Sequence, residues 1–167
     1  MTRKLKIFIS TVMIIISASC LLIAKEIIDK HKADAIIATT PVFSFLTINQ
    51  RTFSNKDIDI DKSRIIINHF SPNCEHCQYM ASEFIKDSQK LKDVQVLMIT
   101  SADSASAKKF SNDYKLSLLS NIIILRDTNY QFQKTFGTGL VPSFFIYEHN
   151  KLVKKVIGET KIENLID

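Results

Sequence analysis

The sequence lacks tryptophan and has only three glycines, three prolines and three cysteines in 167 residues. So little glycine and proline excludes collagen-like and low-complexity chains, and a hydrophobic fraction of 46% excludes an extensively disordered one. No long run of like charge and no basic stripe with interleaved aromatics occurs, so we expect no nucleic-acid partner. The length fits one modest domain with additional terminal segments.

The positive charge is concentrated near the start of the sequence, where Arg3, Lys4 and Lys6 make up more than half of the net charge of +5. No charged residue occurs from Ile7 to Ala24, and residues 5–24 would cross a bilayer if the Lys6 side chain reaches the interface. The positive-inside rule then places the remaining chain outside the cytoplasm. We therefore predict a membrane-anchored domain on the extracytoplasmic side, periplasmic or extracellular.

Residues 1–24 fit two other export signals besides a signal anchor. The small residues Ser17-Ala18-Ser19 suit the cleavage edge of a signal peptide. Cys20 suits the lipid-modified residue of a lipoprotein signal, although Ser17 stands where such signals usually place leucine. All three alternatives export the domain. The mostly polar residues 25–41 are predicted to be a linker, with helix up to about Lys32, and residues 42–167 to be the folded domain.

Beyond the linker, hydrophobic periodicity predicts strands that alternate with helices, between two hairpins. The alternation predicts a parallel core with helices on both faces, and the second hairpin adds antiparallel edge strands. We expect a hairpin at 43–54, strands at 64–70, 94–100 and 121–125, helices from the cysteines onward and at 102–114 and 130–136, a hairpin at 143–157 turning at His149-Asn150, and a terminal helix at 160–167.

Cys74 and Cys77 are the only cysteines outside the N-terminal segment, and Glu75 and His76 separate them. A disulfide across so short a loop constrains the unfolded chain little, so stability is a poor reason for the pair. Cys74 opens a predicted helix, where free amides and the helix dipole stabilise a thiolate, and is the predicted nucleophile. Cys77, one turn later, is the predicted resolving residue. His76 favours the thiolate and Glu75 opposes it or handles protons, so both join the predicted catalytic set.

Two segments resemble the TlpA/ResA-type redoxins of the thioredoxin superfamily: NHFSPNCEHC at 68–77 and GLVPSFFI at 139–146. The resemblance extends from about Phe43 onward. It implies a thioredoxin-like α/β fold, in which helices flank a central mixed sheet. An N-terminal hairpin and an N-terminal membrane anchor are also implied. It also implies a cis Pro142 facing the cysteines, and a Val141 backbone that pairs with the substrate polypeptide.

The activity that the resemblance implies is disulfide exchange with exported proteins that carry cysteine pairs, such as apocytochrome c. A membrane redox donor is an implied partner, and no cofactor is required. The sequence departs from the wider thioredoxin pattern at two positions. Asn68 stands where thioredoxins place a buried acidic proton acceptor, and Asn73 replaces the usual aromatic residue before the first cysteine. Both departures argue against general thioredoxin-like promiscuity.

Two alternative functions remain open from the sequence. His69 and His76 together with the thiols could hold copper, as in an exported copper-binding chaperone. We nevertheless predict no metal, because neither a second cysteine pair nor a spaced histidine pair completes a zinc site. Ser71 precedes Cys74 as the hydroxyl residue of peroxiredoxins does, which makes a thiol peroxidase the other alternative, with Arg126 as its candidate peroxide-site residue.

Overall fold

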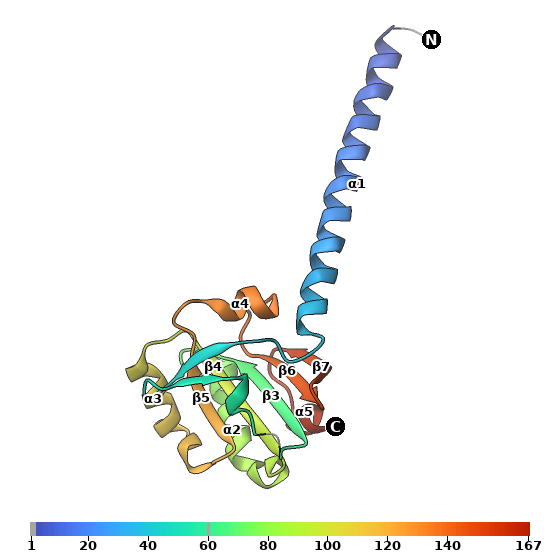
Figure 1. Ribbon diagram of the computed structural model, residues 1–167. Coiled ribbons are helices and arrows are strands. Elements are labelled where there is room, and N and C mark those ends of the chain that lie inside the picture. Colours follow the sequence, from blue (N-terminus) through green and yellow to red (C-terminus); the bar gives the residue numbers. More distant parts are fainter. Residues whose placement is uncertain (1–2, 60) are drawn as a thin grey trace. The chain divides into compact units, whose positions relative to one another are not determined.

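The computed structural model describes residues 3–59 and 61–167; for residues 3–11, 29–31 and 33 it describes only the backbone. The chain divides into two units, up to Ile36 and from Ile37 onward. Helix α1 (Arg3–Ile37) accounts for the described part of the first unit, and its last residue, Ile37, begins the second (Figure 1). The helix continues beyond the predicted end near Lys32. Among the side chains that the structure describes, no helix is long and apolar enough to cross a membrane. The predicted membrane segment lies partly outside these described side chains, up to residue 11.

The second unit is built on one mixed sheet of seven strands. Its parallel core comprises β3 (Arg64–His69), β4 (Val94–Thr100) and β5 (Ile122–Arg126). Antiparallel strands complete both sides, namely β1 (Ser44–Thr47) and β2 (Thr52–Ser54) next to β5, and β6 (Ser143–Glu148) and β7 (Lys151–Ile157) next to β3. The order across the sheet is β2-β1-β5-β4-β3-β6-β7. The predicted parallel core and both predicted hairpins are confirmed.

The central strands β3, β4 and β5 form where the sequence is mostly apolar and β-branched. All seven residues of β4 are buried, as expected of a strand that is covered on both faces. Gln95, one of its two polar residues, uses its side-chain oxygen to accept a hydrogen bond from the Asp59 amide at 3.0 Å. The second hairpin turns at His149 and Asn150, whose φ angles of 46° and 66° are both positive, as a type I′ turn requires.

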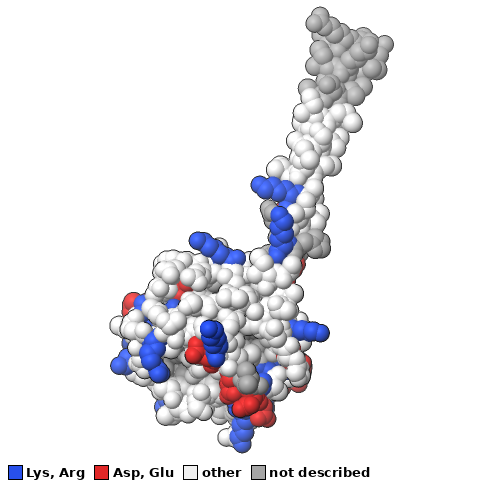
Figure 2. All heavy atoms as spheres, viewed as in Figure 1, with Lys and Arg blue, Asp and Glu red and all other residues white. Residues whose placement is uncertain are grey.

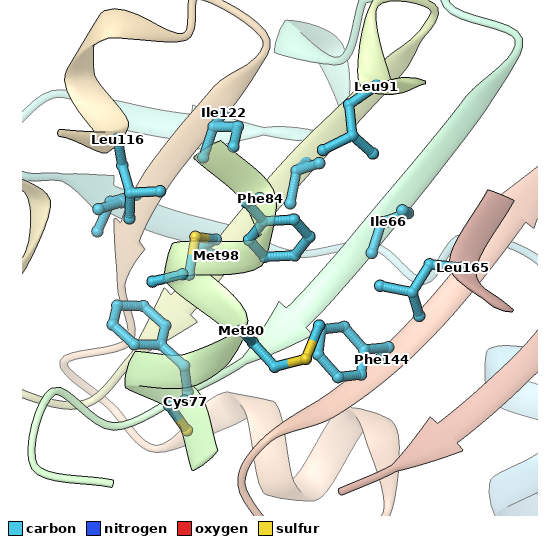
Figure 3. Close-up of a cluster of buried hydrophobic side chains, with 14 of the residues drawn as sticks. Ile66, Cys77, Met80, Phe84, Leu91, Met98, Leu116, Ile122, Phe144 and Leu165 are labelled. Atoms are coloured by element: carbon cyan, nitrogen blue, oxygen red, sulfur yellow. The ribbon is translucent and has the colours of Figure 1, made fainter. Parts of the chain in front are cut away.

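Helices cover both faces of the sheet, as the alternating pattern predicted. One core cluster joins the sheet to α2 (Glu75–Lys86), α3 (Ser104–Asp113) and α5 (Glu163–Ile166), and the other joins it to α4 (Gln131–Phe136) and the β1–β2 hairpin. In the first cluster Cys77, Met80 and Phe84 follow one side of α2, and Met80 extends toward Phe144 (Figure 3). Cys77 is therefore part of a hydrophobic core. Three short 3-10 helices complete the unit: η1 (Asn55–Asp57), η2 (Ser88–Leu91) and η3 (Leu116–Leu118).

The folded unit begins with residues that contact the C-terminal hairpin. Ile37 is buried, and its carbonyl oxygen accepts a hydrogen bond from the hydroxyl of Tyr147 at 3.1 Å. The Ala38 carbonyl accepts one from the Leu152 amide at 2.9 Å. The end of α1 thus marks the first residues of the core, within the range that the sequence predicted as linker.

Charges of both signs are mixed over the face of this unit shown in Figure 2, and neither sign forms a continuous stripe there. Several lysines, and Arg64, pair with nearby carboxylates. Lys109 lies 2.6 Å from Asp113 along α3, and the partly buried Arg64 pairs with Glu148 across β3 and β6. Exposed pairs such as Lys109–Asp113 contribute little to stability, and burial in the two core clusters contributes far more.

Candidate active site

The two cysteines lie where β3 ends and α2 begins. Cys74 is the N-cap residue of α2, with an extended backbone at φ −91° and ψ 117°. Its Sγ accepts a hydrogen bond from the amide of Cys77 at 3.4 Å. An amide donor at a helix N-terminus stabilises a negatively charged sulfur, so the sequence-predicted nucleophile occupies a position that suits its role.

The two thiols have different surroundings. Cys74 is half-buried, whereas the side chain of Cys77 points into the core and only 1% of the residue is exposed. Burial raises the pKa of the Cys77 thiol to about 12, and its hydrogen bond with Cys74 acts in the same direction. Both cysteines are free thiols in the structure. The pair thus combines an accessible sulfur with a buried one that keeps its proton at neutral pH.

A loop from a distant part of the chain completes the site. Residues 68–69 of β3 pair with residues 143–144 of β6, which brings the loop before β6 to the end of β3. The Val141-Pro142 peptide in this loop is cis, as the resemblance implied. The thiol of Cys74 donates to the Val141 carbonyl oxygen, with 3.8 Å between sulfur and oxygen.

The two residues between the cysteines are exposed. His76 places its Nδ1 2.8 Å from Oε2 of Glu159, in the segment that follows β7, and their side chains are 67% and 50% exposed. Glu75 begins α2 and lies in its first turn. The structure therefore brings together the predicted set of Cys74, Cys77 and His76 with a residue that the sequence did not indicate, Glu159.

Residues 36–156 match the model of the AhpC/TSA family, which is most of the chain. The chain belongs to the AhpC/TSA family. A comparison with curated protein sequences found no significant match. Membership identifies the chain as a redoxin, and the geometry around Cys74 shows which sulfur such chemistry can use.

Solved structures with a similar fold include three redoxins. A secreted disulfide oxidoreductase of Mycobacterium tuberculosis, homologous to Escherichia coli DsbE, has a TM-score of 0.60 and 18% identity over 71% of this chain and 85% of that one. A thioredoxin-like protein of Aeropyrum pernix has a TM-score of 0.61 and 16% identity over 89% and 98%. A peroxiredoxin-like protein of Aquifex aeolicus has a TM-score of 0.56 and 15% identity over 71% and 73%. The predicted thioredoxin-like fold is confirmed, and disulfide oxidoreductases are among its structural neighbours.

Asn68 occupies the buried position beneath the site in this AhpC/TSA-family chain. Only 1% of the residue is exposed, and its Nδ2 donates to the carbonyl oxygens of Ser143 at 3.1 Å and His69 at 3.3 Å. Asn68 therefore acts as a hydrogen-bond donor that joins β3 to β6. An amide in this position cannot take up the proton that an acidic residue would accept.

The His69 side chain lies on the opposite face of the sheet from Cys77. Its ring stacks on Phe132 of α4 with 4.3 Å between ring centroids, and its Nδ1 lies 3.3 Å from the Leu140 carbonyl oxygen. Burial lowers the pKa of His69, while the Leu140 carbonyl and Asp127 act in the other direction. Among the described residues, no group of three or more histidine, cysteine or acidic side chains is placed to hold a metal ion. The combination of His69 with the thiols, on which the copper alternative rested, does not form.

A cavity of about 460 Å³ lies beside the cis-proline loop, at the carboxyl ends of β3, β4 and β5. Ligands of open α/β sheets commonly bind at this edge. The lining includes His69, Asn73, Thr100, Phe132 and Val141. Neither this cavity nor one of about 510 Å³ at the other end of β3 is lined by a cysteine. The smaller cavity is the one next to the dithiol, because Asn73 adjoins Cys74 and the Val141 carbonyl oxygen contacts Cys74 Sγ.

Proposed function

We propose that this chain is a thiol-disulfide oxidoreductase that exchanges disulfides with protein substrates through Cys74 and Cys77. The observation that carries the proposal is the asymmetry of the pair. The half-buried Cys74 lies 3.8 Å from the Val141 carbonyl oxygen, and Cys77 is buried with a raised pKa. In such a pair the accessible sulfur can attack a substrate, and the buried sulfur can then release it. Family membership and the disulfide oxidoreductases among its structural neighbours support the same activity.

In the reducing direction, the Cys74 thiolate attacks one sulfur of a substrate disulfide. A mixed disulfide forms between Cys74 and the substrate, and the second substrate sulfur leaves as a thiolate that takes up a proton. Cys77 then loses its proton and attacks Cys74 Sγ, which expels the first substrate sulfur. Two electrons pass from the dithiol to the substrate, and a Cys74–Cys77 disulfide remains. In the oxidising direction the same steps run backward.

The backbone at Val141 and the cavity beside it suit a polypeptide substrate. Val141 directly precedes the cis proline, and in the redoxins that the sequence resembles this position pairs with the substrate backbone. Leu140 next to it is 62% exposed, although it is a large apolar residue. We assign Val141 and Pro142 to substrate positioning and Leu140 to apolar contact with the residues that flank the substrate cysteine.

The proposal is tested by disulfide turnover of the full chain with a protein disulfide as substrate. Wild type should catalyse exchange, and Cys74→Ser should abolish it. Cys77→Ser should stop turnover and accumulate a covalent mixed disulfide that a reducing agent releases. Cys20→Ser, in α1, is the matched control and should keep full turnover. Normal turnover in Cys74→Ser or in Cys77→Ser would overturn the proposal.

A thiol peroxidase is the second candidate, favoured by the family match and by Ser71 three positions before Cys74. The hydrogen bonds of Ser71 and Arg126 give it less support, because among the described residues neither side chain is shown to contact Cys74 Sγ. The Cys74 amide donates to the backbone carbonyl of Ser71 at 3.1 Å, and Nε of Arg126 donates to the Ala102 carbonyl at 3.2 Å. Peroxide consumption by Cys77→Ser at the wild-type rate would favour this second function.

The proposal includes export of the domain and its tethering through residues 5–24. The basic residues before the uncharged run support it, as does the description of the Mycobacterium tuberculosis protein as secreted. Proteins with cysteine pairs and a membrane redox donor are the proposed partners. Labelling of Cys74 in intact cells by a membrane-impermeant thiol reagent tests the location. Labelling only after cell lysis would contradict export.

A further inference from the structure

Glu159 contacts the dithiol motif from the far end of the sequence. Its Oε2 lies 2.8 Å from Nδ1 of His76, across 83 positions of the chain. We propose that Glu159 is a positioning residue that holds the imidazole of His76 and thereby stabilises the reduced form of the Cys74–Cys77 pair. This inference rests on the proposed exchange function, and it adds a residue to that site.

The segment that carries Glu159 is fixed at both of its ends. On one side, the Gly158 amide donates to the Pro142 carbonyl oxygen at 2.8 Å, which ties the segment to the cis-proline loop. On the other side, the Thr160 amide donates to Sδ of Met80 at 3.4 Å, which ties it to α2. Glu159 therefore sits between two anchors, each of which belongs to an element that forms the active site.

Glycine is required at the first of these anchors. Gly158 has a φ of +92°, in the region that L-residues rarely adopt, and β7 ends immediately before it at Ile157. This conformation turns the chain from the edge strand toward α2. Glu159 carries the only carboxylate among residues 158–160, and this carboxylate contacts the imidazole of His76.

A hydrogen-bonded partner on one ring nitrogen of a histidine fixes the tautomer and the ring orientation. With Glu159 accepting from Nδ1, the ring of His76 is held beside the start of α2, where Cys74 is the N-cap. An oriented imidazole in the motif favours negative charge on the attacking sulfur. Stabilising the reduced form in this way makes the disulfide form the stronger oxidant.

The pair itself contributes little to folding. Its two side chains are 67% and 50% exposed, and exposed ion pairs are weak contributors to stability. Variants of Glu159 should therefore unfold at the wild-type temperature. An effect on the dithiol equilibrium without an effect on unfolding separates positioning from a structural role.

The experiment equilibrates the full chain with glutathione and measures the equilibrium constant for reduction of the Cys74–Cys77 disulfide by two glutathione molecules. Glu159→Ala should lower this constant about two- to fivefold, the range expected for one exposed charged contact. Glu159→Gln keeps an oxygen that can accept from Nδ1 and should retain most of the wild-type value. Glu163→Ala is the matched control, because this exposed glutamate pairs with Lys90, and it should match wild type.

Epistasis decides whether Glu159 acts through the imidazole. His76→Ala should lower the constant, and Glu159→Ala should add nothing in that background. A full effect of Glu159→Ala in the His76→Ala background would overturn the inference. The inference would also be overturned if the equilibrium constant of Glu159→Ala equals that of wild type, or if Glu159→Gln lowers the constant as much as Glu159→Ala does. Absence of any exchange with glutathione in wild type would instead reject the proposed function, so the two failures are distinguishable.

Discussion

The sulfur of Cys74 and the carbonyl oxygen of Val141 lie 3.8 Å apart, although 67 positions separate them in the chain. Antiparallel pairing of β6 with β3 produces this contact, since Ser143 pairs with His69 at the end of the strand that leads to the cysteines. A substrate backbone that pairs at Val141 would therefore present its own cysteine next to Cys74. The sheet register thus brings the proposed substrate-pairing backbone of Val141 next to the proposed nucleophile, Cys74.

The pKa of Cys77 predicts how the stability of the reduced protein depends on pH. Its folded-state pKa is raised from an ordinary value of 9.0 to about 12. A group whose pKa is raised on folding contributes stability that is fully present below its unfolded-state value. That contribution should disappear as the pH rises from 9 toward 12.

Denaturant unfolding of reduced protein across this range tests the prediction, with Cys77→Ala as the control. The variant should be less stable at neutral pH because it leaves a cavity, but its free energy of unfolding should fall less steeply as the pH rises. Parallel curves for the two proteins would contradict the raised pKa.

Much of the fold could be predicted because its central strands are short, mostly apolar and bounded by polar turns. β4 has the predicted limits of Val94 and Thr100, and the turn at His149 and Asn150 lies where predicted. The terminal helix was predicted from Thr160 but begins at Glu163, because the segment after β7 first bonds to Met80 and Pro142.

The dithiol and the cis proline could also be predicted, because both occur in recognisable motifs. Glu159 could not, since its contact with His76 depends on the path of the chain after β7 and has no local sequence signal beyond Gly158. The sequence also did not show that His69 lies apart from the thiols, on the other face of the sheet. Strand alternation indicates that Asn68 and His69 face opposite ways, but only the packing of α4 shows what His69 contacts.

Asn68→Asp should destabilise the protein, and the loss should grow with pH. The variant loses a donor to the Ser143 carbonyl oxygen and places a carboxyl group where only 1% of the residue is exposed. Burial should raise the pKa of that carboxyl group, so its stability contribution is lost as the pH rises through the folded-state value. We expect a loss of roughly 2 kcal/mol or more at pH 8 and a smaller loss at pH 5.

Chemical unfolding at both pH values measures this effect, and Asn49→Asp at an exposed turn is the control. The control should differ from wild type by less than about 0.5 kcal/mol at either pH. An Asn68→Asp variant with wild-type stability at pH 8 would show that water or a rearranged partner satisfies the carboxylate.

Gly158→Ala should destabilise the domain although its Cβ would meet no atom within 4 Å. The cost is conformational, because the φ of +92° is unfavourable for any residue with a Cβ. We expect about 1 to 2 kcal/mol in the free energy of unfolding.

Gly139→Ala provides the matched comparison for this substitution. A Cβ at Gly139 would approach only the flexible side chain of Gln133, at 3.3 Å. That side chain can move aside, so the loss should stay within about 0.5 kcal/mol. A larger loss in Gly139→Ala than in Gly158→Ala would mean that crowding, and not backbone conformation, limits these positions.

Leu140→Ser should weaken the binding of polypeptide substrates without slowing the chemistry at Cys74. Leu140 precedes Val141 and is 62% exposed, so its side chain is available to the residues that flank a substrate cysteine. Loss of one apolar contact of about 1 kcal/mol corresponds to a rise in KM of about fivefold. A small aromatic disulfide has no flanking residues, and its rate of reduction should stay at the wild-type value.

Leu118→Ser is the control, because that leucine is 76% exposed and lies in η3, outside the cis-proline loop. If both variants raise KM equally, the effect comes from general surface hydrophobicity. If neither does, the substrate is held by its backbone at Val141 alone.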